Sequence, residues 1–354
     1  MSKRIIALLL ALVMVFALCA CGKGGNGGNS AGTEDVGDET YTIRIACENS
    51  DSYPATLGLY QMEKYVESHT NGKVQIEVCA SGQLGGEEET LEQVAQGNLE
   101  MAVASFAPVV SYVPEFEVMD IPFVYNSYTE AWMVLDSYVG TNLLDKMEAQ
   151  GLKGMAYMEN GMRQVTSNVS AINSIADFKG VKLRTMQNNN HMESFSALGA
   201  NPTPVAFSEL YISLSQKVVD AQENPIANVT DKKLYEVQKY LSLTNHIYDA
   251  MPLVCNLEFF NSLPQAYQKV VQAGAIYAQE FSRFCNYERE SLILADLADK
   301  YGMQINEVSA DARAEMAKVA QPAVIKLVAK DIGQDAVDQY MQDVKDVLAQ
   351  ISKF

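Results

Sequence analysis

The sequence contains few of the residues and motifs on which hydrolytic or metal chemistry depends. It has no Gly-x-Ser-x-Gly and no His-Glu-x-x-His, and its three histidines, His69, His191 and His246, are far apart. The neighbouring acids Glu87 and Glu88 are explained by the start of a predicted helix, where acids favour the helix dipole. We therefore expect no catalytic residue, no metal site and no cofactor.

Cationic residues are also scarce. The chain has 26 Lys and Arg against 44 Asp and Glu, which gives a formal net charge of −18. Such a surface disfavours binding to nucleic acid or to anionic lipid headgroups. A small anionic ligand would need a binding site with locally positive charge.

Cysteines are few, and those of the expected folded part are scattered. Cys47, Cys79, Cys255 and Cys285 do not have the spacing of metal ligands or of a redox pair. The first three lie in strand-like segments, where cysteine packs as a small hydrophobe. A disulfide between Cys47 and Cys79 stays open as the less favoured alternative, because exported proteins meet oxidising conditions.

The N-terminus has the pattern of a secretory signal. Lys3 and Arg4 precede an apolar run at 5–18 that is too short to span a bilayer. The run ends in a leucine and a small residue before Cys21, which resembles the bacterial lipobox. We expect a signal peptide at 1–20, a diacylglyceryl group on Cys21, and attachment to the outer face of the bacterial cytoplasmic membrane. An uncleaved signal anchor is the alternative.

Residues 21–39 are rich in Gly, Asn, Ser and Thr and are nearly without apolar side chains. Such a segment cannot bury enough surface to order itself, so we expect a flexible tether. The residues that follow are numerous and apolar enough for two packed cores. We therefore expect two lobes.

Alternating patterns along the chain predict an α/β fold. The first predicted set comprises strand 41–47, helix 57–68, strand 74–79, helix 87–97 and strand 99–104. The second set comprises strand 154–158, segment 161–167, strand 181–185, helices 192–198 and 207–215, and strand 219–222. This alternation predicts a mostly parallel sheet with helices on its faces.

The chain is expected to cross between the lobes more than once. A predicted strand at 251–256 returns to the first lobe, and 263–300 is one long helical pattern that crosses between lobes. We assign lobe I to 40–160 plus 250–290 and lobe II to 161–249 plus 291–354. Multiple crossings favour a hinge over a loose linker.

Two arginines stand at predicted strand ends in the second set. Arg163 lies in Glu-Asn-Gly-Met-Arg, and Arg184 closes Lys-Gly-Val-Lys-Leu-Arg. Open sheets bind ligands at the carboxyl ends of their strands, and a guanidinium matches a carboxylate in a two-point contact. On position alone, an ordinary salt bridge to Asp or Glu is the favoured alternative for either arginine.

Several longer motifs together resemble the substrate-binding proteins of TRAP transporters, the DctP family. They are Arg-Gln-Val-Thr-Ser-Asn from 163, the segment 171–184, Pro-Thr-Pro-Val-Ala-Phe-Ser-Glu-Leu-Tyr from 202, Val-Asp-Ala-Gln-Glu-Asn-Pro from 219, and Leu-Tyr-Glu-Val-Gln-Lys from 234. With Gln-Leu-Gly-Gly-Glu from 83 and Asp-Ile-Pro-Phe from 120, the resemblance covers nearly all of the chain from Tyr41 onward.

The resemblance implies a periplasmic-binding-protein-like fold, in which two α/β lobes joined by a hinge close on a ligand and a long helix spans both. It implies that Arg184 pairs with the ligand carboxylate and that Arg163 is a second arginine of the site. Asn224 would be the amide that supports the carboxylate. Phe207 would form an aromatic wall against the ligand body.

Two acids extend the expected site into the first lobe. Glu48 ends the first strand and Glu87 opens a helix, at positions where relatives have polar residues that face the ligand. Beside a carboxylate these acids repel unless they accept hydrogen bonds from hydroxyls or an amine, which points to a polyhydroxylated acid. A solvent-exposed helix acid is the open alternative for Glu87.

The pattern is closest to the sialic-acid-binding branch, with one departure. That branch carries a glutamate and an arginine where this chain has Ser105 and Pro108. We therefore favour a smaller ligand, such as a hexuronate or an aldonate. The amides at 187–190 either serve ligand hydroxyls or cap a helix.

The expected function is capture of a small organic acid and its delivery to a small and a large TRAP membrane subunit, with transport driven by an ion gradient. One alternative is an extracellular sugar-acid lyase with Glu48 or Glu87 as base. The other is a signalling or adhesive lipoprotein.

Overall fold

The computed structural model describes residues 39–350. The predicted signal peptide, Cys21 and nearly all of the predicted tether lie outside the described residues, as do 351–354. Between residues 39 and 350, no helix combines the length and the apolar composition that a membrane span requires.

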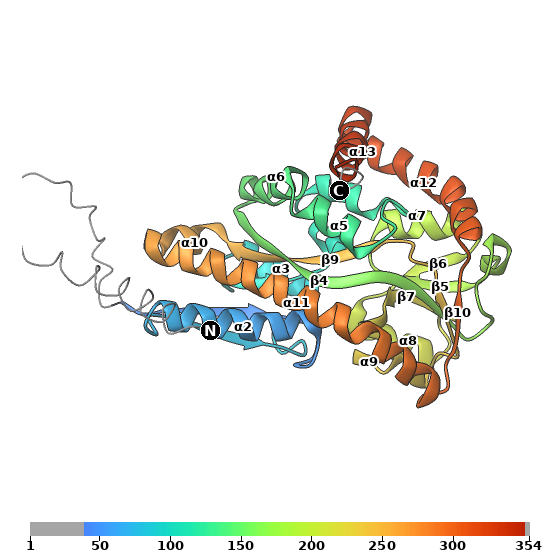
Figure 1. Cartoon of the computed structure of the whole chain (residues 1–354), viewed down its shortest axis with the longest axis horizontal. Coiled ribbons are helices and arrows are strands. Elements are labelled where there is room, and N and C mark those ends of the chain that lie inside the picture. Colours follow the sequence, from blue (N-terminus) through green and yellow to red (C-terminus); the bar gives the residue numbers. More distant parts are fainter. Residues whose placement is uncertain (1–38, 351–354) are drawn as a thin grey trace, which may run out of the picture. The chain divides into compact units, whose positions relative to one another are not determined.

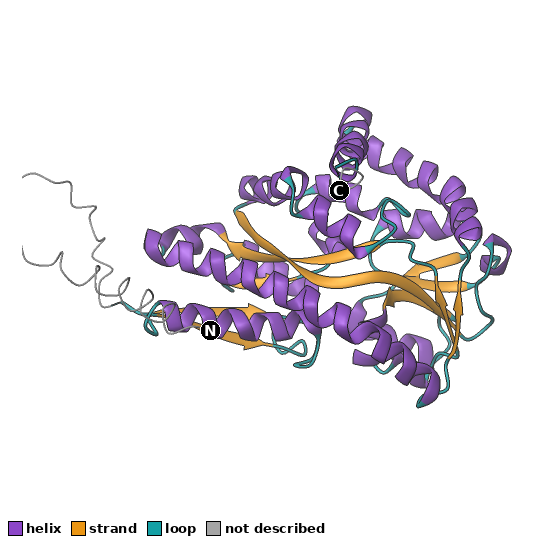
Figure 2. Cartoon of the chain, in the orientation of Figure 1, coloured by secondary structure: helices purple, strands orange, loops and turns teal. Residues whose placement is uncertain are grey.

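Ten strands form the sheet of the described part. They are β1 (Tyr41–Ala46), β2 (Val74–Cys79), β3 (Met101–Val103), β4 (Leu152–Ser167), β5 (Lys182–Thr185), β6 (Asn201–Pro204), β7 (Ala221–Pro225), β8 (Tyr240–Leu243), β9 (Tyr248–Asn256) and β10 (Gln304–Glu307). The α-helices are α2 (Pro54–His69), α3 (Glu87–Ala95), α4 (Phe106–Val109), α5 (Tyr128–Leu135), α6 (Tyr138–Lys146), α7 (Asn189–Ala197), α8 (Leu210–Ser215), α9 (Ile226–Asp231), α10 (Leu257–Ser262), α11 (Gln265–Asp299), α12 (Ala310–Ile332) and α13 (Gln334–Leu348). Figure 2 shows helices on both sides of the strands.

The strand order is β2-β1-β3-β9-β4-β7-β5-β6, and β8 joins β4 to β10. β1 runs parallel to β2 and β3, and β5 runs parallel to β6 and β7. β9 and β4 are antiparallel to their neighbours, so the sheet is mixed rather than mostly parallel. The prediction missed this because strand direction depends on which strands become neighbours, which a local pattern does not record.

β4 is a single strand of 16 residues, where the sequence pattern indicated two pieces. Its residues 152–162 pair with β9 and its residues 163–167 pair with β7 and β8. We call the strands on the β9 side the first half of the sheet and those on the β7 side the second half. The register shifts between Glu159 and Gly161, so the chain passes from one half to the other at an irregularity inside the strand.

Gly161 is required at this irregularity. Its φ is +126°, and a Cβ there would lie 3.1 Å from the hydroxyl oxygen of Tyr128 and 3.3 Å from Cβ of Pro225. Other residues rarely adopt this backbone conformation.

The long helix α11 packs on α2 beside the first half and on α9 beside the second (Figure 1). Gly58 of α2 allows close approach, because a Cβ there would come within 2.6 Å of the carbonyl oxygen of Ala278. The expected α/β architecture with one long helix along both halves is confirmed.

The C-terminal helices also connect the two halves. Met316 and Ala320 of α12 belong to a core cluster of the second half. Val328 of α12 and Val344 of α13 belong to the core cluster of the first half. Residues 291–350 therefore contribute to both cores.

All four cysteines among residues 39–350 are buried free thiols. The alternative Cys47–Cys79 disulfide is therefore absent, although the backbone N–H of Cys47 does donate to the carbonyl of Cys79 at 3.0 Å.

Candidate ligand-binding site

A small cavity of about 10 Å³ lies where the two halves meet. Its walls come from the ends of several strands and from the helices that follow them. They are formed by Asn49, Glu87, Ser105, Asn160, Arg184, Met186, Phe207, Asn224, Asn228 and Met251. The volume is far below the roughly 300–1,000 Å³ of typical small-molecule sites, so the walls must move apart to admit a ligand.

Arg184, in β5, supplies the positive charge of the cavity. Its side chain is 1% exposed, and Nε donates to the carbonyl of Val205 at 2.8 Å. Nη1 is buried and has no hydrogen-bond partner among the described residues. Burial lowers the pKa of Arg184 from its usual value to about 10, while the nearby Glu223 acts in the opposite direction. A buried cation held in this way gains strongly from an anionic partner.

Arg163 is not among the residues that line the cavity. Its side chain is fully buried behind the cavity, where Nε pairs with Glu223 and Nη1 contacts Asp249 at 2.7 Å. Nη2 donates to the amide oxygen of Asn224 at 3.3 Å. Burial lowers the pKa of Arg163, but the two carboxylates outweigh burial and raise it. Arg163 therefore supports a cavity-lining amide, and direct contact with a ligand stays a prediction.

Asn224 and Phe207 both line the cavity, as their expected roles require. Asn224 lies in β7, and its Nδ2 donates to Gln222 at 2.7 Å while its amide oxygen accepts from Asn228 at 3.3 Å. Phe207 presents its ring to the cavity, with Nζ of Lys232 4.5 Å from the ring centroid. The predicted helix at 207–215 starts as a short 3₁₀ turn before α8.

Glu87 is a buried cavity residue, with 6% of its surface exposed, and not a solvent-exposed helix acid. Ser105 Oγ donates to its Oε1 at 3.0 Å, and its backbone N–H donates to Glu48 Oε2 at 3.2 Å. Burial, and then the charge of Glu48, raises the pKa of Glu87 to about 8. Glu87 therefore holds a proton at neutral pH and can donate as well as accept a hydrogen bond.

Glu48 lies directly behind Glu87 and does not itself line the cavity. Burial raises its pKa, whereas the charge of Lys232 at 4.0 Å lowers it. Its Oε1 has no hydrogen-bond partner among the described residues.

The sequence interpretation missed three amides of the wall. Asn49 donates to Asn228 at 3.0 Å, and Asn228 donates to Asn160 at 3.0 Å. Asn224 lies in β7 and Asn228 in α9, so no helical spacing relates the two residues and no local pattern could have revealed Asn228. Asn188, from the amide run, caps α7 and donates to Asp120 at 2.8 Å, so it is a cap and not a wall residue.

Two histidines that are distant in sequence, His191 and His246, both lie beside Glu223, the carboxylate that pairs with Arg163. His246 Nε2 lies 3.1 Å from Glu223 and His191 Nε2 lies 3.1 Å from Asp120. Although burial opposes it, Asp120 raises the pKa of His191 to about 9. Among residues 39–350, no cluster of His, Cys, Asp and Glu side chains could hold a metal ion.

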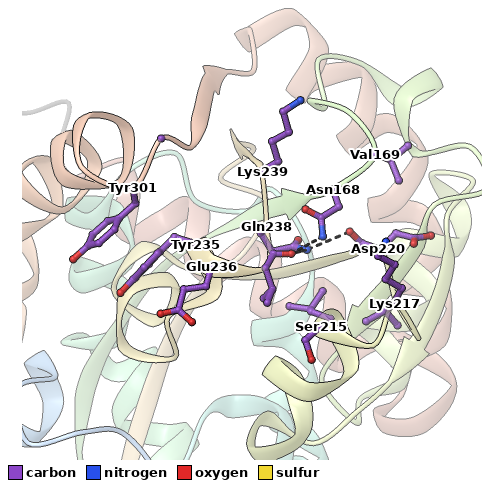
Figure 3. A pocket seen from close by; sticks show the side chains of 14 residues that line it. Asn168, Val169, Ser215, Lys217, Asp220, Tyr235, Glu236, Gln238, Lys239 and Tyr301 are labelled. Atoms are coloured by element: carbon purple, nitrogen blue, oxygen red, sulfur yellow. Dashed lines mark hydrogen bonds between the residues drawn. The ribbon is translucent and has the colours of Figure 1, made fainter.

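A larger hollow of about 750 Å³ lies in the second half, beside the stacked rings of Tyr235 and Tyr301 (Figure 3). Its buried amide, Gln238, already donates to Val237 and accepts from Thr166. None of the side chains that line this hollow is a buried polar group without a hydrogen-bond partner. Its chemistry therefore indicates no particular ligand, in contrast to the cavity at Arg184.

A cavity between two halves of a sheet, with one buried arginine facing it and amides around it, defines a solute-binding protein of the periplasmic-binding-protein class. The model of a family described as bacterial extracellular solute-binding protein, family 7, matches residues 45–331. A solute-binding protein of Verminephrobacter eiseniae is 33% identical over 264 residues, which are 75% of this chain and 78% of the relative.

Solved structures agree with this match. The sugar acid binding protein DctPAm from Advenella mimigardefordensis, in complex with galactonate, has a TM-score of 0.83 and 31% identity, covering 87% of this chain and 99% of that one. A TRAP periplasmic solute binding protein from Polaromonas sp. JS666, bound to D-erythronate, has a TM-score of 0.80 and 34% identity, covering 85% of this chain and 98% of that one.

The chain belongs to family 7 of the bacterial extracellular solute-binding proteins, the DctP family of TRAP transporters. Its class is that of extracytoplasmic proteins that bind small organic acids for transport. It is a binding protein and not an enzyme, which excludes the lyase alternative.

Proposed function

We propose that this protein captures a small hydroxylated monocarboxylate, such as an aldonate or a hexuronate, with the carboxylate held by Arg184. The observation that carries the proposal is the buried Nη1 of Arg184, which has no hydrogen-bond partner among the described residues and faces a cavity walled by amides. Galactonate and D-erythronate, bound by two similar proteins, are both of this chemical class.

The distribution of charge favours one carboxylate over two. Arg184 is the one cationic residue among those that line the cavity, because Arg163 is committed to Glu223 and Asp249. A second carboxylate at the far wall would find no cationic partner among the lining residues, because Glu87 is neutral when protonated and Glu48 behind it is an acid. Hydroxyl groups instead find both donors and acceptors there, in Glu87 and the amides.

In this proposal Arg184, Asn224 and Phe207 contact the ligand, and Glu87 binds a hydroxyl. Arg163 and Glu48 act one layer behind, by orienting Asn224 and Glu87. The two halves of the sheet act as the two lobes, with the boundary near residue 160, and close over the ligand because it binds the closed form better.

The proposal includes the membrane context. A diacylglyceryl group on Cys21 would hold the protein at the outer face of the membrane, and the tether would let it reach a small and a large membrane subunit. The anchor is tested by phase separation in Triton X-114, in which the mature protein should enter the detergent phase. A mature protein that stays in the aqueous phase with Cys21 intact would contradict the anchor.

The ligand class is tested by a thermal-shift screen followed by calorimetry. Galactonate, D-erythronate and glucuronate should raise the melting temperature more than succinate, because a ligand that binds only the folded state stabilises it. Arg184→Gln should abolish the response, whereas Arg44→Gln, which removes the same charge from an exposed pair with Glu100, should leave it intact. A response to succinate alone would contradict the proposed class.

A further inference from the structure

Three consecutive residues after β1 contact the end of α9, although about 180 positions separate them in the sequence. Asn49 Nδ2 donates to Asn228 Oδ1 at 3.0 Å. The backbone N–H of Ser50 donates to Asp231 Oδ2 at 3.4 Å, and its hydroxyl donates to Asp231 Oδ1. These contacts join the first half of the sheet to the second across the edge of the cavity.

The third contact carries charge. Lys232 Nζ lies 4.0 Å from Glu48 Oε1 and 4.5 Å from the centroid of the Phe207 ring. Lys232 thus joins the acid behind Glu87 to the aromatic wall. The chain turns directly afterwards, since Lys233 has a φ of 52°.

The segment after β1 is fixed independently of α9. The Tyr60 hydroxyl donates to Asp51 at 2.5 Å, and Arg289 of α11 donates to the carbonyl of Ser52 at 3.1 Å. When the two halves come together, the end of α9 therefore contacts a segment whose conformation is already held by other hydrogen bonds.

From this arrangement we infer that these residues form a clasp, which stabilises the closed form and sets the affinity for every ligand by a common factor. The inference rests on the proposed function, in which closure follows ligand capture. The clasp consists of Glu48, Asn49, Ser50, Asn228, Asp231 and Lys232.

Ser50 and Asp231 allow the clasp to be tested apart from ligand contacts, because neither residue lines the cavity. A change in cavity-wall residues alters which acid binds best. A change at Ser50 or Asp231 shifts only the balance between open and closed forms, and so weakens all ligands equally.

The test is a double-mutant cycle with Ser50→Ala, Asp231→Ala and the pair, titrated with galactonate and with D-erythronate. Each single variant should weaken both acids by the same factor, about tenfold, as expected when a hydrogen bond to a charged group is lost. The double variant should lose little more, because both changes break one interaction. Asp296→Ala, which removes an exposed acid paired within its own helix, and Ser262→Ala are the matched controls.

Unchanged affinities, or a changed ratio between the two acids, would overturn the clasp. A second readout needs no ligand: a chain with Ser50→Cys and Asp231→Cys should form an intramolecular cross-link with a short bismaleimide. If the cross-link forms and none of the acids binds the wild-type protein, the proposed ligand class fails and the clasp stands. If no cross-link forms, the clasp fails whatever the protein binds.

Discussion

Replacement of Arg184 by methionine should stabilise the ligand-free protein while it removes ligand affinity. Methionine has a similar length and fills the same buried space, but it carries no charge. In the folded chain Arg184 is 1% exposed, and its Nη1 has no hydrogen-bond partner among the described residues. The wild-type fold therefore carries an electrostatic cost that the substitution removes.

The size of this cost follows from the pKa of Arg184, which burial lowers from its usual value to about 10. At about 1.4 kcal/mol per pKa unit, the charged form is disfavoured in the fold by about 3 kcal/mol. Because the pKa of Arg184 is lower in the folded chain than in the unfolded chain, the fold is destabilised by this full amount at neutral pH. The destabilisation is lost only as the pH rises through the folded-state pKa. The substitution also removes the hydrogen bond from Nε to Val205, which lowers stability by about 1 kcal/mol. The net increase in the free energy of unfolding is therefore about 2 kcal/mol.

Chemical and thermal denaturation of the ligand-free variant measure this gain. The melting temperature should rise by about 4 °C, at roughly 2 °C for each kcal/mol in a chain of this size. Arg44→Met is the control, because Arg44 is partly exposed and paired with Glu100 at 2.8 Å, and it should give no gain. A ligand-free Arg184→Met protein that melts below the wild type would refute the electrostatic reasoning.

Three further substitutions test other parts of the structure. Because burial and Glu48 raise the pKa of Glu87 from 4.5 to about 8, the folded chain binds this proton more tightly than the unfolded chain, and stability should fall as the pH rises between those values. Glu87→Gln should remove that slope in urea titrations from pH 5 to 9; an unchanged slope would contradict the burial of Glu87. Gly161→Ala should lower the free energy of unfolding by about 1–3 kcal/mol through backbone strain, and more than Gly72→Ala, whose added Cβ meets nothing within 4 Å. Arg163→Met should cost about 3–5 kcal/mol, because it removes the arginine partner that two buried carboxylates share; an unchanged denaturation midpoint would show that those carboxylates do not depend on Arg163.

Local patterns predicted the elements whose periodicity is strong. The strand, helix and strand at the start of the fold appear as β1, α2 and β2 within a few residues of the expected bounds, and the long pattern at 263–300 appears as α11. β6 was missed because Asn201–Pro204 contains two prolines, which are tolerated there only because β6 lies at the edge of the sheet.

The site could be predicted in part, since its chemistry is local while its geometry is not. Arg184, Asn224, Phe207 and Glu87 were singled out by residue type and motif, and each lines the cavity. The position of Arg163 depends on Glu223, 60 residues away, and on Asp249, 86 residues away, which no local pattern records.

The contact between Arg184 and a carboxylate is tested most directly by calorimetric titration with galactonate and with galactitol, the uncharged polyol of the same chain length. We predict that the wild-type protein binds galactonate and not galactitol, and that Arg184→Met binds neither. Equal binding of the two compounds to the wild-type protein would contradict the role of Arg184.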